Sequence, residues 1–285
     1  MNTPYEILVP DETRHRLAAY EANLVSRLAA PGRRLAATLE AGPDLLTALL
    51  RTKQPLIFAE SAVAGDGSDW NQTELGLLGD ISVAMGVTVF DDGRHSGPVV
   101  FDQPFEAGLV FVPGALLRSA GPGKPADWDE VVNDQGRFHA AAYDALHARR
   151  LLPGFRWIEK QAEKLGHPAL VTLPGLGCGQ FAGPFHGRLG AELERALRRF
   201  LEQHGREFTH IRSVIYDPYQ ECRPDRAAIG GIDFRVRPLA TGGRPQLSRP
   251  ADHALDAGDR EFLGNCRLFS FVAWDHVSWP GNDFY

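Results

Sequence analysis

The chain has 285 residues, of which 44% are apolar and 23% are charged, and this is enough for one large α/β domain. A net charge of −6 without a basic stripe argues against nucleic-acid binding, and the lack of a basic leader or a membrane-length apolar run argues against membrane insertion. Three widely spaced cysteines without a Cys-x-x-Cys pair indicate a reducing compartment, so we expect a cytoplasmic protein with no zinc or other metal site.

The first fifty residues have helical spacing of apolar side chains and no evident chemistry. Helices are expected over residues 11–30, 33–40 and 43–51, because leucines recur on one face and Pro-Gly or Gly-Pro pairs separate the segments. We expect residues 1–54 to form a helical layer or cap packed on a core made of residues 55–285, as one compact unit.

Apolar strand patterns alternate with amphipathic helix patterns through the rest of the chain, which predicts an α/β fold. Apolar and polar side chains alternate in residues 232–238, which predicts an edge strand, and residues 241–259 are expected to be irregular. The glycine-rich stretch 60–71 is predicted to be a flexible loop that faces a ligand. The other expected strands are 55–59, 81–90, 99–103, 109–113, 168–173, 211–216 and 268–274, and the expected helices are 73–78, 133–150, 153–166 and 188–204.

A glycine-rich turn joins the strand that ends at Leu173 to the helix that starts near Arg188. The stretch from Leu173 to Phe185 reads LPGLGCGQFAGPF. Glycines let backbone N–H groups approach an anion closely, and the start of a helix adds a favourable partial charge, so we predict a diphosphate site. The spacing GxGxG, without a following Lys-Ser/Thr, matches neither common nucleotide fingerprint. A plain turn between strand and helix is the alternative.

Two isolated carboxylates are second-rank candidates for ligand contact. Asp217 follows the strand 211–216, and polar residues just beyond the carboxyl ends of parallel strands gather at the ligand crevice. Asp80 follows Gly79 and precedes a strand. For Asp80 a role as a loop carboxylate or helix cap is favoured over a ligand contact.

The C-terminal tail is unusually rich in aromatic and carboxylate side chains. The strand 268–274 runs directly into DHVSWPGNDFY, which contains Asp275 and Asp283 on either side of a Pro-Gly turn. Cleavage of an N-glycosidic bond builds positive charge on the sugar, which one carboxylate can stabilise while another orients the leaving group or activates water. A carboxylate also matches an arginine guanidinium in a bidentate way. The alternative is a structural plug in which both aspartates cap turns.

The glycine-rich turn resembles the second phosphate loop of macrodomains, a family that binds ADP-ribose in a three-layer α/β/α fold. This match covers residues 133–218, about a third of the chain. The run from Trp274 to Asp283 looks like the C-terminal signature of a divergent macrodomain group, which includes bacterial effectors that remove ADP-ribose from arginine. The paired asparagines of the usual first macrodomain loop, and the further aspartate-bearing segment of that group, are not recognisable here. The resemblance implies a three-layer α/β/α mixed sheet with extra N-terminal helices.

The same resemblance implies an enzyme that cleaves the N-glycosidic bond between ADP-ribose and an arginine side chain of a modified protein. It implies that Asp275 and Asp283 are catalytic, that Asn282 contacts ADP-ribose, that the arginine-linked ADP-ribosylated protein is the partner, and that no cofactor is needed. It also implies that the whole turn binds ADP-ribose: Gly175, Leu176, Gly177, Cys178, Gly179, Gln180 and Phe181.

Two other interpretations stay open. In the first, the chain is a module that binds ADP-ribose without cleaving it, and the tail carboxylates are structural. In the second, Cys178 is a nucleophile for acyl transfer with a histidine as its base, because a turn between strand and helix can stabilise a thiolate.

Overall fold

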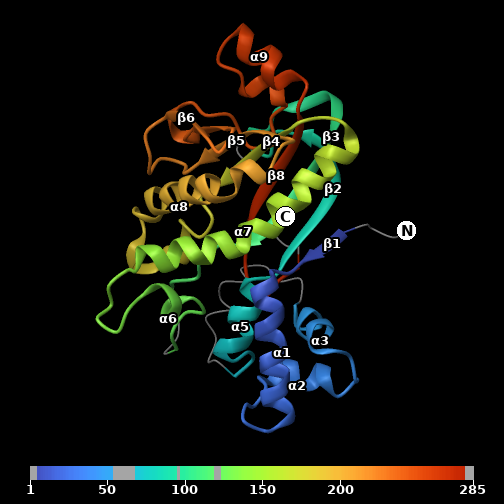
Figure 1. The fold of residues 1–285 in the computed structure, drawn as a ribbon, viewed down its shortest axis with the longest axis vertical. Helices are drawn as coiled ribbons and strands as arrows, with labels where there is room; N and C mark the ends of the chain where they lie inside the picture. Colours follow the sequence, from blue (N-terminus) through green and yellow to red (C-terminus); the bar gives the residue numbers. More distant parts are fainter. Residues whose placement is uncertain (1–4, 54–67, 95–96, 119–122, 280–285) are drawn as a thin grey trace.

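A single mixed β-sheet organises the computed structural model, which describes residues 5–53, 68–94, 97–118 and 123–279 (Figure 1). Among these residues the sheet has eight strands in the order β1-β2-β3-β8-β4-β5-β7-β6. The strands are β1 (Tyr5–Leu8), β2 (Ser82–Asp91), β3 (Val100–Pro113), β4 (Ala169–Pro174), β5 (Ile211–Asp217), β6 (Asp225–Ile229), β7 (Ile232–Val236) and β8 (Arg267–Trp274).

The middle of the sheet is parallel, and this sets the position of the site. The last strand, β8, lies between β3 and β4 and is parallel to both, and β5 and β7 continue the parallel set beyond β4. The outer pairs β1–β2, β2–β3 and β6–β7 are antiparallel. Because parallel strands end on the same edge, the segments that follow β3, β4, β5 and β8 all leave the sheet at one carboxyl edge.

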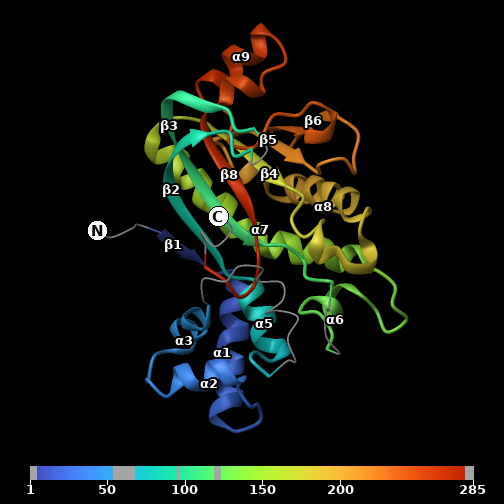
Figure 2. The same ribbon diagram turned by 180° about the vertical axis from the view of Figure 1, so that it is seen from behind.

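Two long helices cover one face of the sheet, as Figures 1 and 2 show from opposite sides: α7 (Ala140–Leu165) and α8 (Leu189–His204). The leucines predicted on one face of α8 are all buried in the main core, together with alternate residues of the central strands. The opposite face carries shorter elements: η3 (Leu239–Thr241), η4 (Pro250–His253) and α9 (Ala257–Gly264). The expected mixed-sheet α/β fold with added N-terminal helices is confirmed.

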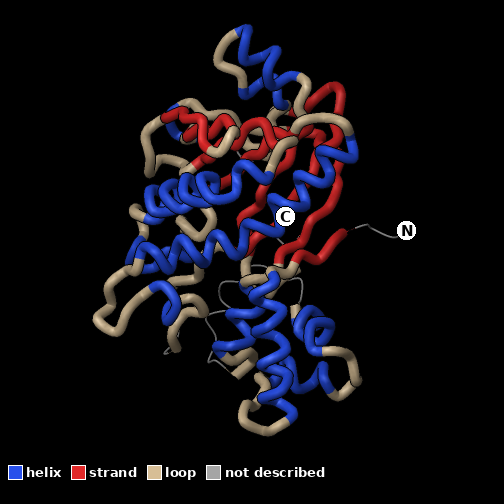
Figure 3. Tube along the Cα trace, viewed as in Figure 1, coloured by secondary structure: helices blue, strands red, loops and turns tan. Residues whose placement is uncertain are grey.

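The N-terminal helices gather beyond the carboxyl edge of the sheet (Figure 3), where their side chains form a second core. Here α1 (Asp11–Val25), α2 (Arg33–Leu39), α3 (Leu45–Thr52) and α5 (Gln72–Gly79) bury an apolar cluster of their own. A capping box between Asn71 and Glu74 starts α5. The division expected at residue 54 differs from this arrangement, because α5 belongs to the helical layer and β1 joins the sheet. We call these helices the N-terminal layer.

Five expected elements, in three parts of the chain, differ in the structure. The strands expected at 99–103 and 109–113 are one strand, β3, whose middle pairs with β2. The two helices expected on either side of Pro153 are one helix, α7, because burial of its continuous apolar face outweighs the lost hydrogen bond at the proline. The prediction of an edge strand at 232–238 is wrong, because β7 lies between β5 and β6 in the sheet. The strand 55–59 and most of the loop 60–71 lie outside the described residues.

Candidate functional site

Three loops meet at the carboxyl edge of the sheet. The N–H of Leu117 donates to the carbonyl of Phe181 at 2.8 Å, which joins the loop after β3 to the loop after β4. The rings of Phe181 and His276 make an edge contact with centroids 6.5 Å apart, which joins the loop after β4 to the turn after β8. The site therefore combines residues 114–118, 175–181 and 275–279.

Glycines allow two of these loops to touch backbone to backbone. Gly177 has a φ of +72°, and a Cβ placed there would lie 2.7 Å from the N and O atoms of Ala115. A Cβ on Gly114 would lie 2.2 Å from the N atom of Gly177. A side chain at either position would separate the loops, so the glycine-rich sequence is required for their packing.

The turn after β4 has backbone N–H groups that make no hydrogen bond to a described residue. The side chains of Leu176 and Cys178 point into the core, whereas Gly179 and Gln180 are exposed. Among the described residues no hydrogen bond uses the N–H groups of Gly177, Gly179, Gln180 or Phe181. The last two residues begin the short helix η1 (Gln180–Phe185), and Arg118 donates to the side-chain oxygen of Gln180. Free N–H groups at a helix start beside a guanidinium are typical of an anion site.

Cys178 is not a candidate nucleophile in this structure. Its side chain is buried, and burial together with the Glu221 carboxylate raises the pKa of the Cys178 thiol well above its ordinary value. A thiol that stays protonated at neutral pH is a poor nucleophile, so the acyl-transfer interpretation is set aside.

Alkylation provides a direct check of this burial. Iodoacetamide should leave Cys178 unmodified in the folded chain and modify it once the chain is unfolded in denaturant, as measured by mass spectrometry of the digested protein. Labelling of Cys178 in the folded chain at the rate of an exposed cysteine would contradict the buried position.

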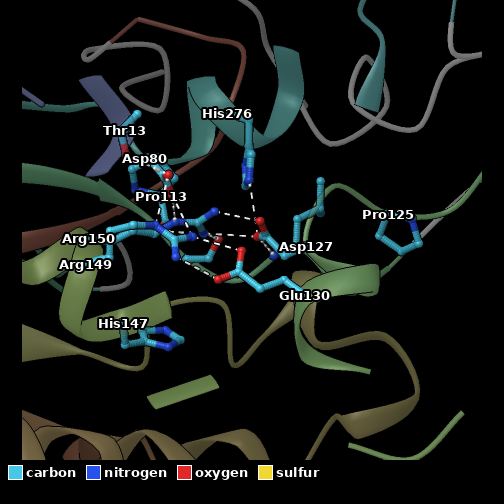
Figure 4. A network of polar contacts seen from close by, with 12 residues as sticks. Thr13, Asp80, Pro113, Pro125, Asp127, Glu130, His147, Arg149, Arg150 and His276 are labelled. Atoms are coloured by element: carbon cyan, nitrogen blue, oxygen red, sulfur yellow. Dashed lines mark hydrogen bonds and ion pairs between the residues drawn. The ribbon is translucent and has the colours of Figure 1, made fainter. Parts of the chain in front are cut away.

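Asp80 does not face the three loops. It has the structural role that its sequence favours, as a buried carboxylate at the end of a helix. It ends α5, is fully buried, and accepts hydrogen bonds from Thr13 Oγ1 at 2.8 Å and Arg16 Nη1 at 2.6 Å. Arg149 Nε and Arg150 Nε donate to it from α7 at 3.0 and 3.1 Å (Figure 4). Burial alone would raise the pKa of Asp80, but these arginines hold it below its ordinary value. The carboxylate therefore joins α1, α5 and α7 instead of contacting a ligand.

A second buried carboxylate, Asp127, contacts two of these three loops, through Leu116 and His276 (Figure 4). Arg150 donates to both of its oxygens, at 2.6 and 3.0 Å, and the N–H of Leu116 donates to Oδ2 at 2.7 Å. The Nε2 atom of His276 is 3.4 Å from Oδ2, within ion-pair range, although neither ring nitrogen makes a hydrogen bond to a described residue. Sequence reasoning missed Asp127 because it lies in a stretch of glycines and prolines that predicts a surface loop.

Asp275 holds its own turn. Its Oδ1 atom accepts hydrogen bonds from the N–H groups of Val277 and Ser278, both at 2.7 Å, and its Oδ2 atom accepts from the hydroxyl of Ser278. The side chain is buried, so the contacts are those of the capping alternative. Asn282 and Asp283, the other tail residues predicted to act, lie outside the described residues.

A cavity of about 650 Å³ opens on the second face of the sheet, beside the carboxyl end of β5. Asp217 and Tyr219 border it, and Asp217 Oδ1 accepts hydrogen bonds from the N–H groups of Tyr219 and Leu239, both at 2.8 Å. Burial raises the pKa of Asp217. A Cβ on Gly175 would lie 3.9 Å from the Cα atom of Pro218, so the cavity rim adjoins the glycine-rich turn. The structure thus places Asp217 near the glycine-rich turn, and its contact with a ligand stays a prediction.

Within the residues that the structure describes, no group of three or more histidine, cysteine, aspartate or glutamate side chains is placed to hold a metal ion. In the same part of the chain, no helix combines the length and the apolar character needed to cross a membrane.

A mixed α/β sheet with an open, glycine-rich turn at its carboxyl edge defines a macrodomain-like protein. The chain belongs to the macrodomain effector MavL family, whose description, "Macrodomain effector MavL", matches residues 5–285. The match includes the N-terminal layer and the tail, so the resemblance to a bacterial-effector macrodomain is confirmed well beyond residues 133–218. A comparison with curated proteins found no match. Membership in this family supports a function related to ADP-ribose.

Proposed function

We propose that this protein is an ADP-ribosyl hydrolase that cleaves the N-glycosidic bond between ADP-ribose and an arginine side chain of a modified protein. One observation carries the proposal: the open N–H groups of the turn after β4 lie beside the turn that begins at Asp275, in a chain of the macrodomain effector family. Free backbone N–H groups and the turn that begins at Asp275 are thus adjacent.

The diphosphate of ADP-ribose binds to the N–H groups of Gly177, Gly179, Gln180 and Phe181, with Arg118 nearby as a counter-charge. The adenosine half occupies the cavity bordered by Asp217 and Tyr219, whose rim adjoins the turn; the volume of this cavity lies in the range usual for small-molecule sites. The distal ribose then points toward the turn of residues 275–279, after which the sequence continues to the remaining candidate carboxylate, Asp283.

The reaction breaks the bond between ribose C1″ and the guanidine nitrogen and forms a bond from C1″ to the oxygen of water. The leaving nitrogen takes up a proton and the water loses one, so the products are ADP-ribose and unmodified arginine. Asp283 supplies the carboxylate that activates water or stabilises the positive charge on the sugar. Because the oxygens of Asp275 are engaged by its own turn, we assign Asp275 the task of holding that turn in place.

A module that binds ADP-ribose without cleaving it is the second candidate. The observation that favours it is the bonding of Asp275, which serves the turn whether or not a reaction takes place.

Release of free ADP-ribose from an arginine-modified protein tests the proposal. Asp283→Asn is expected to lower kcat by about 100- to 10,000-fold, the usual contribution of a general acid or base, and to leave the Kd for ADP-ribose unchanged. Asp275→Ala should also lower turnover, because the turn loses its cap. Asp134→Asn, an exposed carboxylate, is the matched control and should have the activity of the unmodified chain.

Two results would go against the enzyme. Unchanged turnover in both Asp275→Ala and Asp283→Ala would refute the assigned roles. Binding of ADP-ribose by the unmodified chain, with no release from any linkage, would select the binding module.

A further inference from the structure

The turn after β8 is anchored in the N-terminal layer as well as in the sheet. Val277 is fully buried and belongs to the apolar cluster of the N-terminal helices, which includes Leu49 of α3 and Leu78 of α5. The ammonium of Lys53, at the end of α3, donates to the backbone carbonyl of His276 at 2.8 Å. Two consecutive residues of the turn are thus held by a layer that is distant in sequence.

The ring of His276 is fixed from two further sides. A Cβ on Gly79, at the end of α5, would lie 2.5 Å from its Cδ2 and Nε2 atoms, so the helix backbone packs directly on the ring. Asp127 approaches Nε2 from the opposite part of the network shown in Figure 4. The ring therefore has little freedom to reorient, and the Lys53 contact with the His276 carbonyl adds to the hydrogen bonds that Asp275 makes within the turn.

Lys53 is an unusual choice for a purely structural contact. Its side chain is 4% exposed, and an ammonium in such a place loses its hydration. Burial lowers the pKa of Lys53 to about 8, and the charge of Asp275 opposes this shift. Replacing a buried charge by an apolar side chain of similar size is often neutral for stability or even stabilising.

We propose that Lys53 is a positioning residue for the hydrolysis: its ammonium holds the carbonyl of His276 and thereby helps to fix the turn of residues 275–279, to which Asp275 belongs. This inference rests on the proposed function and adds to it that the N-terminal layer is a working part of the site. Because the described polar contact of Lys53 is with the His276 carbonyl and not with the turn after β4, we expect its removal to act on the rate of the reaction and not on the binding of ADP-ribose.

The test uses Lys53→Met in the full chain, because methionine keeps most of the stem and removes the charge. We expect kcat for ADP-ribose release to fall by about 10- to 100-fold, the usual cost of a misplaced reacting group, with KM and the Kd for ADP-ribose within about two-fold of the unmodified chain. The Tm should stay close to that of the unmodified chain. Arg51→Met, an exposed cation at the same end of α3, is the matched control and should change none of these values.

Hydrogen exchange at the N–H groups of Val277 and Ser278 gives a readout that does not require activity. Lys53→Met should increase their exchange rates, because the turn that they close becomes looser. Val277→Ala removes the apolar anchor and should also increase these rates. If Lys53→Met does not fold, Val277→Ala decides whether the N-terminal layer holds the turn. An unmodified chain without turnover, but with the expected change in exchange, would refute the hydrolase and keep the anchoring. A kcat equal to that of the unmodified chain, or unchanged exchange at both N–H groups, would overturn the proposal for Lys53.

Discussion

Gly177→Ala is expected to abolish measurable binding of ADP-ribose and to lower the free energy of unfolding by about 2 to 4 kcal/mol. The residue has a φ of +72°, which an alanine adopts only with strain, and its added methyl would overlap the backbone of Ala115 at 2.7 Å. The loops after β3 and β4 must then separate. Since the free N–H groups belong to this turn, their common orientation is lost with it.

A matched variant separates strain from displacement. Gly187 has a similar φ of +79°, but a Cβ there would meet no atom within 4 Å. Gly187→Ala should cost about 1 kcal/mol of stability and leave ADP-ribose binding intact. Isothermal titration calorimetry and urea unfolding measure both quantities; equal ADP-ribose affinities for the two variants would show that the contact between the loops does not shape the site.

Asp127→Ala should have the largest effect on stability, about 3 to 5 kcal/mol, because it leaves a buried guanidinium without its bidentate partner. Arg150 is 1% exposed on its side chain and retains only its contacts with Asp80 and with backbone carbonyls. The N–H of Leu116 also loses its acceptor. Urea unfolding followed by circular dichroism measures the change. Asp129→Ala, which removes an exposed ion pair with Lys124, is the control and should unfold like the unmodified chain.

Asp127 also makes the stability of the fold depend on pH. Burial alone would raise the pKa of Asp127, but Arg150 and the neighbouring His276 ring hold it well below the ordinary value of 3.8. A lowered pKa in the folded state means that the stabilisation is complete above about pH 4 and is lost as the pH falls below that value. As the pH is lowered below about 4, the free energy of unfolding should fall less steeply in Asp127→Asn than in the unmodified chain. An equally steep fall would mean that other carboxylates account for the pH dependence.

Local patterns were sufficient to predict the turn and most of the sheet. The strand before the turn, the helix after it and the leucine face of α8 follow from spacing within about twenty residues, and all three are confirmed. The buried polar network was not predictable in the same way. Its members Asp80, Asp127, Arg150 and His276 are far apart in the chain and meet only when α7 crosses the ends of β3 and β8.

Asp275 shows how a local signal and a family signature can point to different roles. An aspartate that precedes two residues with free N–H groups often caps a turn, and here the carboxylate accepts both of those N–H groups and the hydroxyl of Ser278. The family resemblance assigns it to catalysis. The two signals agree if Asp275 serves the proposed reaction by holding its own turn in place.

The most direct test of the diphosphate site is an NMR titration of the ¹⁵N-labelled chain with ADP-ribose. The N–H groups of Gly177, Gly179, Gln180 and Phe181 should show large, saturable shifts, because they gain an anionic acceptor. Ribose 5-phosphate should produce smaller shifts at higher concentration. Saturable shifts confined to other parts of the molecule, with these four N–H signals unchanged, would contradict the account.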